Sequence, residues 1–288
     1  MSMLTVKAAD GGAFGAWLAL PPGGRGPGLL LLQEIFGVND VMRERAAWFA
    51  GCGFTVLVPD LFWRQQPGVQ LTDRTDADWA RALQLYKGLD EAQAVSDGAA
   101  ALALLRTLPS CTGVAGAAGW CLGGKLAFLL SARGSSARGR AGAGAGAGAG
   151  VGAGAGAGAR VGTDAGAGAH AAKASAASAD HGRPDACVGY YGVGIHESLD
   201  EAAGIVTPLL LHIAGEDEYG PPPAQKAVHA ALDKHPQVTL RDYPGLGHAF
   251  ARPGGKHFDE AAAELADLRT VVFLQRKLAA SAHASRPG

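Results

Sequence analysis

The sequence predicts an α/β protein with an open, mainly parallel sheet flanked by helices on both faces. Short, unbroken apolar runs, GLLLLQ at 28–33 and PLLLHIA at 208–214, are typical of strands that are buried on both faces of a parallel sheet. Segments with apolar residues at helical spacing alternate with such runs along the chain. In a sheet of this kind, the groups that do chemistry are expected at the carboxyl ends of the strands.

The charge balance argues against large charged partners. The chain of 288 residues has 25 basic and 26 acidic residues, which gives a formal charge of −1. Such a chain has no electrostatic reason to bind nucleic acid or an anionic membrane, so we expect neither as a partner. No apolar run reaches the roughly eighteen residues that span a bilayer, and the N-terminus lacks the pattern of a signal peptide.

The cysteines indicate a reducing compartment. They lie far apart at positions 52, 111, 121 and 187 and form no C-x-x-C pair. In a chain of this length, that usage is typical of free thiols rather than of a disulfide framework. We therefore expect a soluble, cytoplasmic protein. The sequence does not reveal the oligomeric state, and a monomer is one possibility.

Turn and cap signals divide the chain into elements. Asp10-Gly11-Gly12 is expected to join strands at 3–8 and 14–20, and Asn39 or Asp40 to cap a helix that ends near Gly51. The other expected strands are 28–33, 54–58, 112–118, 187–191, 208–214 and 238–243. The other expected helices are 73–87, 90–107, 125–133, 222–234 and 257–280.

A Gly-Ala tract interrupts this pattern between residues 139 and 169. Its residues offer almost no side-chain surface to bury and lose much backbone entropy on ordering, so we expect a disordered insertion. A silk-like β segment is the alternative, because Gly-Ala repeats can stack between chains. We expect one domain over 1–280, interrupted at 134–184 by this insertion, and a frayed tail at 281–288.

The segment GWCLGG at 119–124 joins an expected strand to an expected helix. Glycines on both sides of Cys121 fit a sharp turn that exposes the central side chain, as in the G-x-S-x-G nucleophile motif. A thiol at a helix N-terminus ionises readily, which suits a nucleophile. The alternative is a small buried cysteine in a glycine-rich turn.

Three further groups follow predicted strands directly and could assist this thiol. They are Glu34, Asp217 and His248, and the chain order of Cys121, Asp217 and His248 is nucleophile, acid and base. Each group also has a purely structural interpretation. Asp217 could solvate an acidic turn, where two neighbouring glutamates could take its role. His248 could be an ordinary loop histidine, and Glu34 a charge that marks a strand end.

Several motifs occur in the order seen in the dienelactone hydrolase family, which the chain resembles over roughly 1–133 and 184–278. They are QEIFGVND at 33–40, VPDLF at 58–62, GWCLGG at 119–124, GYYGVG at 189–194, GEDEYGP at 215–221 and GHAFAR at 247–252. The resemblance implies the α/β-hydrolase fold. It also implies hydrolysis of a small carboxylated enol-lactone, of the dienelactone to maleylacetate type, without a cofactor or a metal.

The same resemblance implies roles for the groups at the strand ends. Cys121 is the expected nucleophile, His248 its base and Asp217 the acid that orients the histidine. Glu34 is expected to hydrogen-bond the thiol and help to activate it. The substrate is expected to be a small lactone or ester.

Further residues are expected to bind the reacting groups. The amide N–H groups of Leu122 and Ile35 are expected to form the oxyanion hole. Arg252 would bind the substrate carboxylate through its planar guanidinium, unless it is simply a surface arginine. Arg81, on the helix before the nucleophile, is a further expected substrate contact.

Some positions depart from the family pattern. Neither Arg81 nor Tyr86 falls in the register of the family's substrate-binding arginine and tyrosine, Ala249 replaces a common serine, and Trp120 replaces a commoner tyrosine. These departures leave the exact substrate open. Another ester or thioester hydrolase on the same scaffold is one alternative, and a non-catalytic thiol sensor or binding protein is another.

Overall fold

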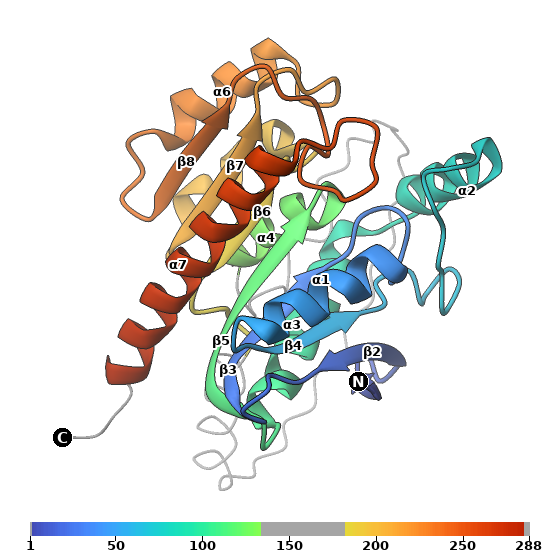
Figure 1. Cartoon of the computed structure of the whole chain (residues 1–288), viewed down its shortest axis with the longest axis vertical. Coiled ribbons are helices and arrows are strands. Elements are labelled where there is room, and N and C mark those ends of the chain that lie inside the picture. The colour runs from blue at the N-terminus through green and yellow to red at the C-terminus, as the bar shows by residue number, and fades with distance from the viewer. Residues whose placement is uncertain (1, 134–181, 285–288) are drawn as a thin grey trace, which may run out of the picture.

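In the residues that the computed structural model describes, 2–133 and 182–284, eight strands form one sheet with a parallel centre (Figure 1). Most of the predicted insertion at 134–184 lies outside these residues. The strands are β1 (Ser2–Lys7), β2 (Ala13–Ala19), β3 (Gly26–Leu32), β4 (Thr55–Pro59), β5 (Cys111–Trp120), β6 (Cys187–Tyr190), β7 (Leu209–Ala214) and β8 (Val238–Tyr243).

The order of the strands is β1-β2-β4-β3-β5-β6-β7-β8. β1 and β2 pair antiparallel, β2 and β4 pair antiparallel, and all remaining neighbours are parallel. The chain leaves β3 for β4 on one side and returns to β5 on the other side. A crevice therefore opens between the carboxyl ends of β3 and β5, where doubly wound sheets bind their ligands.

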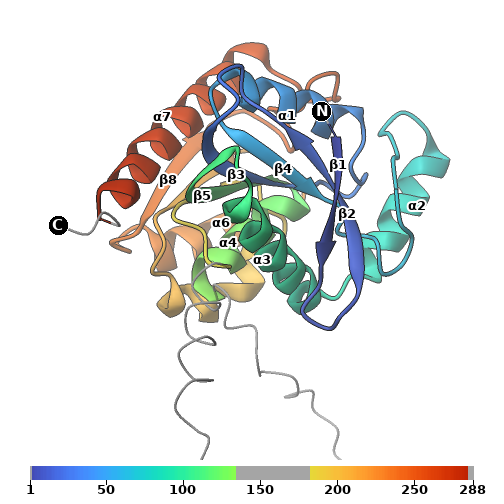
Figure 2. The ribbon, with the colours of Figure 1, turned by 90° about the horizontal axis from the view of Figure 1, so that it is seen from below.

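Helices cover both faces of the sheet, as the sequence predicts. They are α1 (Asp40–Gly51), α2 (Asp76–Lys87), α3 (Glu91–Thr107), α4 (Leu122–Arg133), α6 (Pro222–Leu232) and α7 (Glu260–Ala284), with a 3₁₀ segment η1 (Ile195–Gly204). Figure 2 shows α1 and α7 on one face and α3, α4 and α6 on the other.

Strand β3 shows why its apolar run is unbroken. All four leucines from Leu29 to Leu32 are fully buried. Leu30 and Leu32 pack in the core beneath α3 and α4, whereas Leu29 and Leu31 pack in the core beneath α1 and α7. Since alternate residues of a strand point to opposite faces, a strand covered on both sides must be apolar at every position.

Two elements differ from the prediction. η1 was not expected, although Ile195, Leu199 and Ala202 follow the i, i+4, i+7 spacing of a helical face. α7 begins at Glu260 rather than at 257, since Asp259 caps it by accepting a hydrogen bond from the amide of Ala262 at 2.9 Å. α7 also continues to Ala284, so the first four residues of the tail expected at 281–288 are helical. The rest of that tail lies outside the described residues.

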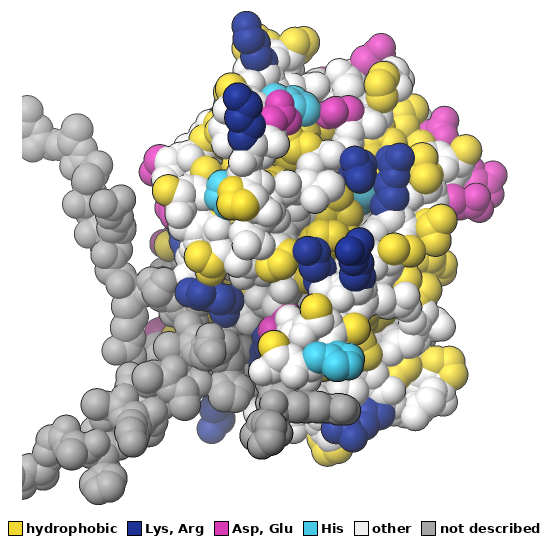
Figure 3. All heavy atoms as spheres, turned by 90° about the vertical axis from the view of Figure 1, so that its left-hand side faces the viewer, with side chains coloured by type: hydrophobic (Ala, Val, Ile, Leu, Met, Phe, Trp, Pro, Cys, Tyr) yellow, Lys and Arg dark blue, Asp and Glu magenta, His cyan; other side chains and the backbone are white. Residues whose placement is uncertain are grey.

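Within the described ranges, no helix is both long and apolar enough to cross a bilayer. On the face drawn in Figure 3, basic, acidic and apolar side chains are interspersed rather than gathered in one continuous patch.

Candidate active site

Cys121 lies on the sharp turn between β5 and α4. Its φ of 55° falls in the left-handed region, which non-glycine residues rarely adopt and which therefore stores strain. A Cβ added at Gly119 would lie 2.1 Å from the carbonyl oxygen of Gly123, and one added at Gly123 would lie 2.1 Å from the carbonyl oxygen of Leu32. The glycines around Cys121 are thus required because the turn packs tightly on itself and on the end of β3.

His248 and Asp217 form a buried pair at the ends of β8 and β7. The Nδ1 atom of His248 lies 2.9 Å from Oδ2 and 3.1 Å from Oδ1 of Asp217, and both side chains are less than a tenth exposed. An Nδ1–H that donates to the carboxylate leaves Nε2 as the basic nitrogen. Nε2 is therefore free to accept a proton in the pocket that His248 shares with Cys121.

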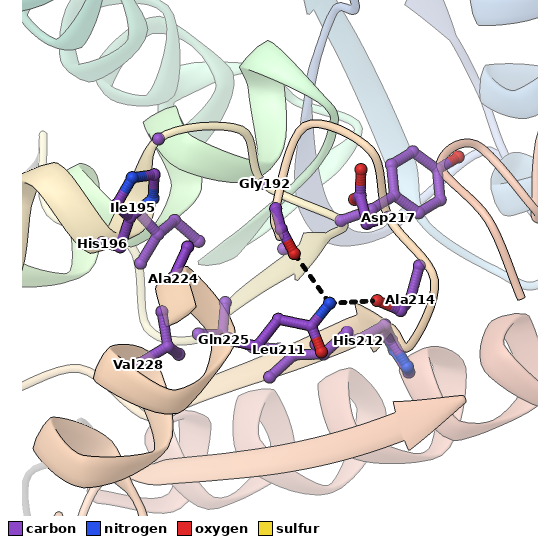
Figure 4. A pocket seen from close by; sticks show the side chains of 15 residues that line it. Gly192, Ile195, His196, Leu211, His212, Ala214, Asp217, Ala224, Gln225 and Val228 are labelled. Atoms are coloured by element: carbon purple, nitrogen blue, oxygen red, sulfur yellow. Dashed lines mark hydrogen bonds between the residues drawn. The ribbon is translucent and has the colours of Figure 1, made fainter. Parts of the chain in front are cut away.

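Hydrogen bonds from the side chain of Gln225 on α6 stabilise the turn that carries Asp217. The Nε2 atom of Gln225 donates to the carbonyl oxygens of Ala214 at 3.1 Å and Gly220 at 2.7 Å (Figure 4). The amide of Tyr219 donates to Oδ1 of Asp217 at 2.9 Å. These bonds fix both ends of the turn, so the carboxylate faces His248. A cavity of about 50 Å³ lies behind it.

The surroundings of His248 favour its protonated form. Burial lowers the pKa of His248, but the Cys121 sulfur and the Asp217 carboxylate outweigh burial and raise it to about 10. The rings of Tyr191 and Tyr219 pack edge-to-face on the imidazole of His248 and hold it in place. Their centroids lie 5.0 and 4.9 Å from the centroid of the imidazole. An imidazole that binds a proton this firmly can draw the proton from a thiol.

Arg252 is buried against two carboxylates. Its Nη1 atom lies 2.5 Å from Oε2 of Glu34, and its Nε atom lies 3.5 Å from Oδ2 of Asp73. The guanidinium also stacks on Phe36, with Cζ 4.5 Å from the ring centroid. Arg252 is therefore no surface arginine, and Glu34 faces this guanidinium.

These groups line one pocket of about 250 Å³ at the carboxyl end of the sheet. Its walls include Glu34, Ile35, Phe36, Asp73, Trp79, Leu83, Tyr86, Cys121, Val193, Glu218, Tyr219, His248, Ala249, Arg252, Lys256 and His257. Burial, followed by the charge of nearby groups, raises the pKa of Tyr86 and the pKa of Tyr219. Both hydroxyl groups therefore stay protonated at neutral pH and can donate hydrogen bonds.

Two backbone amides, at the Cys121 turn and at the end of β3, lack an acceptor among the described residues. Leu122 is the first residue of α4, where its N–H has no intrahelical acceptor. Ile35 follows β3 and lines the pocket, and its N–H meets no acceptor among the described residues. Because the Cys121 turn packs against the end of β3, both amides belong to the same crevice.

The structure contradicts the expected substrate contact of Arg81. This side chain lies on the outer surface of α2, where it donates to Gln84 at 2.6 Å and to Gln66 at 2.5 Å. It does not line the pocket. The helix itself gives the reason, because Trp79, Leu83 and Tyr86 follow the i, i+4, i+7 spacing of one helical face and Arg81 lies off that face.

Several pocket residues escaped the sequence analysis. The spacing of Trp79, Leu83 and Tyr86 was a readable signal of an apolar face on α2. Tyr219 and Lys256 carried no such signal, because loops bring them to the pocket. Within the described ranges, no cluster of three or more histidine, cysteine or acidic side chains could hold a metal ion.

Comparison with known proteins agrees with this arrangement. The model of the dienelactone hydrolase family matches residues 14–144 and 167–278. A protein of Azospirillum brasilense named "Putative carboxymethylenebutenolidase" is 37% identical over 287 residues, which cover 96% of this chain and 100% of the relative. A carboxymethylenebutenolidase of Pseudomonas sp. (strain P51) is 32% identical over 273 residues, which cover 95% of this chain and 94% of the relative.

The fold has a close counterpart among solved structures. The "Putative Dienelactone Hydrolase" of Klebsiella pneumoniae superposes with a TM-score of 0.70 at 18% identity, over 95% of this chain and 97% of the other. The layered sheet described above is thus the α/β-hydrolase fold, as the sequence predicts. With the family model matched over most of its length, the chain belongs to the dienelactone hydrolase family.

Proposed function

We propose that the protein hydrolyses a small carboxylated enol-lactone, of the dienelactone to maleylacetate type, through a thioester on Cys121. The observation that carries the proposal is the pocket shared by Cys121, His248 and the buried guanidinium of Arg252, with Asp217 paired to His248. Nucleophile, base and a cation for the substrate carboxylate are all needed for this reaction. The names of the relatives point to the same substrate class.

The first half of the reaction forms the thioester. The thiol proton of Cys121 passes to Nε2 of His248, and the sulfur forms a bond to the lactone carbonyl carbon. The negative charge moves to the carbonyl oxygen, which the amides of Leu122 and Ile35 stabilise. The bond from carbon to the ring oxygen then breaks, and the ring oxygen leaves as an enolate that takes up the proton held by His248, so the imidazole is neutral again.

The second half releases the acid. A water molecule gives a proton to His248 and attacks the thioester carbon, and the carbon–sulfur bond breaks. The thiolate takes this proton back from His248, so the enzyme is restored and the net change is addition of one water to the lactone. Asp217 stabilises the imidazolium in both halves and holds the ring in the required tautomer.

Arg252 gives this reaction a requirement for a carboxylated substrate. A carboxylate that enters the pocket competes with Glu34 for the guanidinium, which binds carboxylates through two parallel hydrogen bonds. Once displaced, Glu34 would be free to turn toward the thiol and help to deprotonate it. Asp73 and Phe36 would keep the guanidinium in place during this exchange.

The proposal is tested with dienelactone, whose ultraviolet band disappears on ring opening. Purified protein should remove the band, and Cys121→Ala should reduce the rate at least ~10³-fold. Equal rates for the two proteins would rule out Cys121 as the nucleophile.

Another ester or thioester hydrolase is the second candidate, favoured by the position of Arg81 outside the pocket. A panel that pairs carboxylated with neutral esters separates the two, because only the first candidate requires a carboxylate. In either case the proposal includes a small-molecule substrate, a cytoplasmic location and action as a monomer without a cofactor or a metal. The free cysteines among the described residues support the location.

A further inference from the structure

The pocket carries a second cation, Lys256, at its mouth. Lys256 belongs to the loop between β8 and α7, four positions after Arg252, and its side chain is exposed while lining the pocket. Within the described ranges, its ammonium group forms no hydrogen bond and no ion pair. An unpaired charge at the mouth of a pocket is available to an incoming ligand.

The acidic side chains of the pocket are engaged elsewhere, which explains why Lys256 is unpaired. Glu34 and Asp73 both contact Arg252. Glu218 lies near His257, with Oε1 3.9 Å from Nδ1. Arg252 is thus neutralised by two carboxylates, whereas the charge of Lys256 is uncompensated.

The two cations also differ in how they are held. Arg252 is 5% exposed and held by Glu34, Asp73 and Phe36. Lys256 follows Gly254, whose φ of 73° needs a glycine, and Gly255. A lysine ammonium on a flexible four-carbon stem can follow a ligand as a point charge, whereas a fixed guanidinium recognises one geometry.

We propose that Lys256 is a specificity-determining residue, which binds the carboxylate of an anionic substrate at the mouth and favours it over a neutral ester. The proposal rests on the proposed function for the substrate class, but not for the attraction of an anion to the pocket. Lys256 thus supplies a positive charge to the pocket, whereas Arg81 faces away from the pocket and supplies none.

The first test is a comparison of substrates. Lys256→Met keeps the apolar stem and removes the charge, Lys256→Arg keeps the charge, and Lys226→Met removes an exposed lysine on α6 that does not line the pocket. In Lys256→Met, the ratio of kcat/KM for the carboxylated lactone to kcat/KM for p-nitrophenyl acetate should fall about tenfold, mostly through KM. Lys256→Arg and Lys226→Met should keep the ratio of the wild type.

The second test does not depend on turnover. Iodoacetate and iodoacetamide differ in charge but alkylate the same thiol, and peptide mass spectrometry reports the modification of Cys121. The ratio of the iodoacetate rate to the iodoacetamide rate should fall severalfold in Lys256→Met and stay unchanged in Lys226→Met.

The two tests separate the possible failures. If the wild type opens no carboxylated lactone but the alkylation ratio falls in Lys256→Met, the proposed function fails and the role of Lys256 in anion binding stands. If Lys256→Met matches Lys226→Met in the alkylation ratio, the role of Lys256 is overturned, whether or not the lactone is hydrolysed.

Discussion

Arg252 and Glu34 form an ion pair with 2.5 Å between Nη1 and Oε2, and their side chains are only 5% and 6% exposed. The two residues follow different strands, β8 and β3, and meet at the wall of the pocket that contains Cys121. A buried pair of this kind is costly to break on one side only, because the remaining charge stays buried without a partner. The pair therefore couples substrate recognition to the stability of the pocket.

Removal of one partner should be more harmful to stability than removal of both. Arg252→Met should lower the free energy of unfolding by about 3–5 kcal/mol, because Glu34 is left unpaired. Arg252→Met combined with Glu34→Gln should restore most of that loss without restoring the preference for carboxylated substrates. Urea unfolding and the substrate panel measure the two effects. A double variant as unstable as the single one would contradict the coupling.

Asp217 should act on the rate and not on the fold. Asp217→Asn keeps the size of the side chain but no longer stabilises the imidazolium of His248, so kcat/KM should fall on the order of 10³-fold. The pKa of His248 should also fall, because Asp217 is one of the groups that raise it. The pH profile of kcat/KM and far-ultraviolet circular dichroism check both statements. A rate within tenfold of the wild type would show that Asp217 does not orient the base.

The glycine at position 123 should not tolerate any side chain. In Gly123→Ala, the new Cβ would lie 2.1 Å from the carbonyl oxygen of Leu32, so the turn and β3 must separate. We expect a loss of stability of about 3 kcal/mol or more, together with loss of activity. Gly51→Ala is the matched control, since a Cβ there meets nothing within 4 Å. Thermal unfolding of the two variants tests the prediction, and equal Tm values would contradict it.

His212 should make the protein sensitive to acid. Burial lowers the pKa of His212 from 6.5 to about 3, and its ring nitrogens are held by Tyr243 and Thr270 at 2.8 and 3.0 Å. Above pH 6.5 the ring is neutral in both states. Below that pH the unfolded chain binds a proton and the folded chain does not, so stability should decline by up to about 1.4 kcal/mol per pH unit until pH 3.

A second histidine provides the control for this pH dependence. The pKa of His229 is raised: burial lowers it, but Asp233 and Asp242 outweigh burial. Its contribution has the opposite sign, since it is present below pH 6.5 and is lost as the pH rises. It should also be small, because both aspartate partners are more than half exposed. The urea midpoint of unfolding, measured from pH 7 to pH 4, should depend less on pH in His212→Gln than in the wild type. In His229→Gln its dependence on pH should be unchanged. The reverse result would contradict this assignment.

The strands and the polar groups at and beside the pocket could be predicted because local patterns encode them. The apolar run at 28–33 became β3, and the glycines of 119–124 mark a turn that only glycine can build. Glu34, Asp217 and His248 were predictable from their positions at strand ends, since parallel strands end at one edge of the sheet.

The remaining features depend on contacts between distant segments. Nothing local indicates that Glu34 faces Arg252, because 218 positions separate them. η1 is a different case, because Ile195, Leu199 and Ala202 carry a helical spacing in the sequence, and this face packs against α4 and α6. The contact expected for Arg81 rested on its place on the helix before the nucleophile, whereas the spacing of Trp79, Leu83 and Tyr86 marks the face of α2 that lines the pocket.

The central claim, that the Cys121 sulfur forms a thioester with the substrate, can be tested by mass spectrometry of acid-quenched reactions. The His248→Gln variant is mixed with a carboxylated p-nitrophenyl ester. In this variant, hydrolysis of the thioester should be slowed more than its formation, so the acyl adduct should accumulate. We predict a mass increase equal to the acyl group on the peptide that contains Cys121. Release of p-nitrophenol without any adduct on that peptide, or an adduct on another residue, would contradict the account.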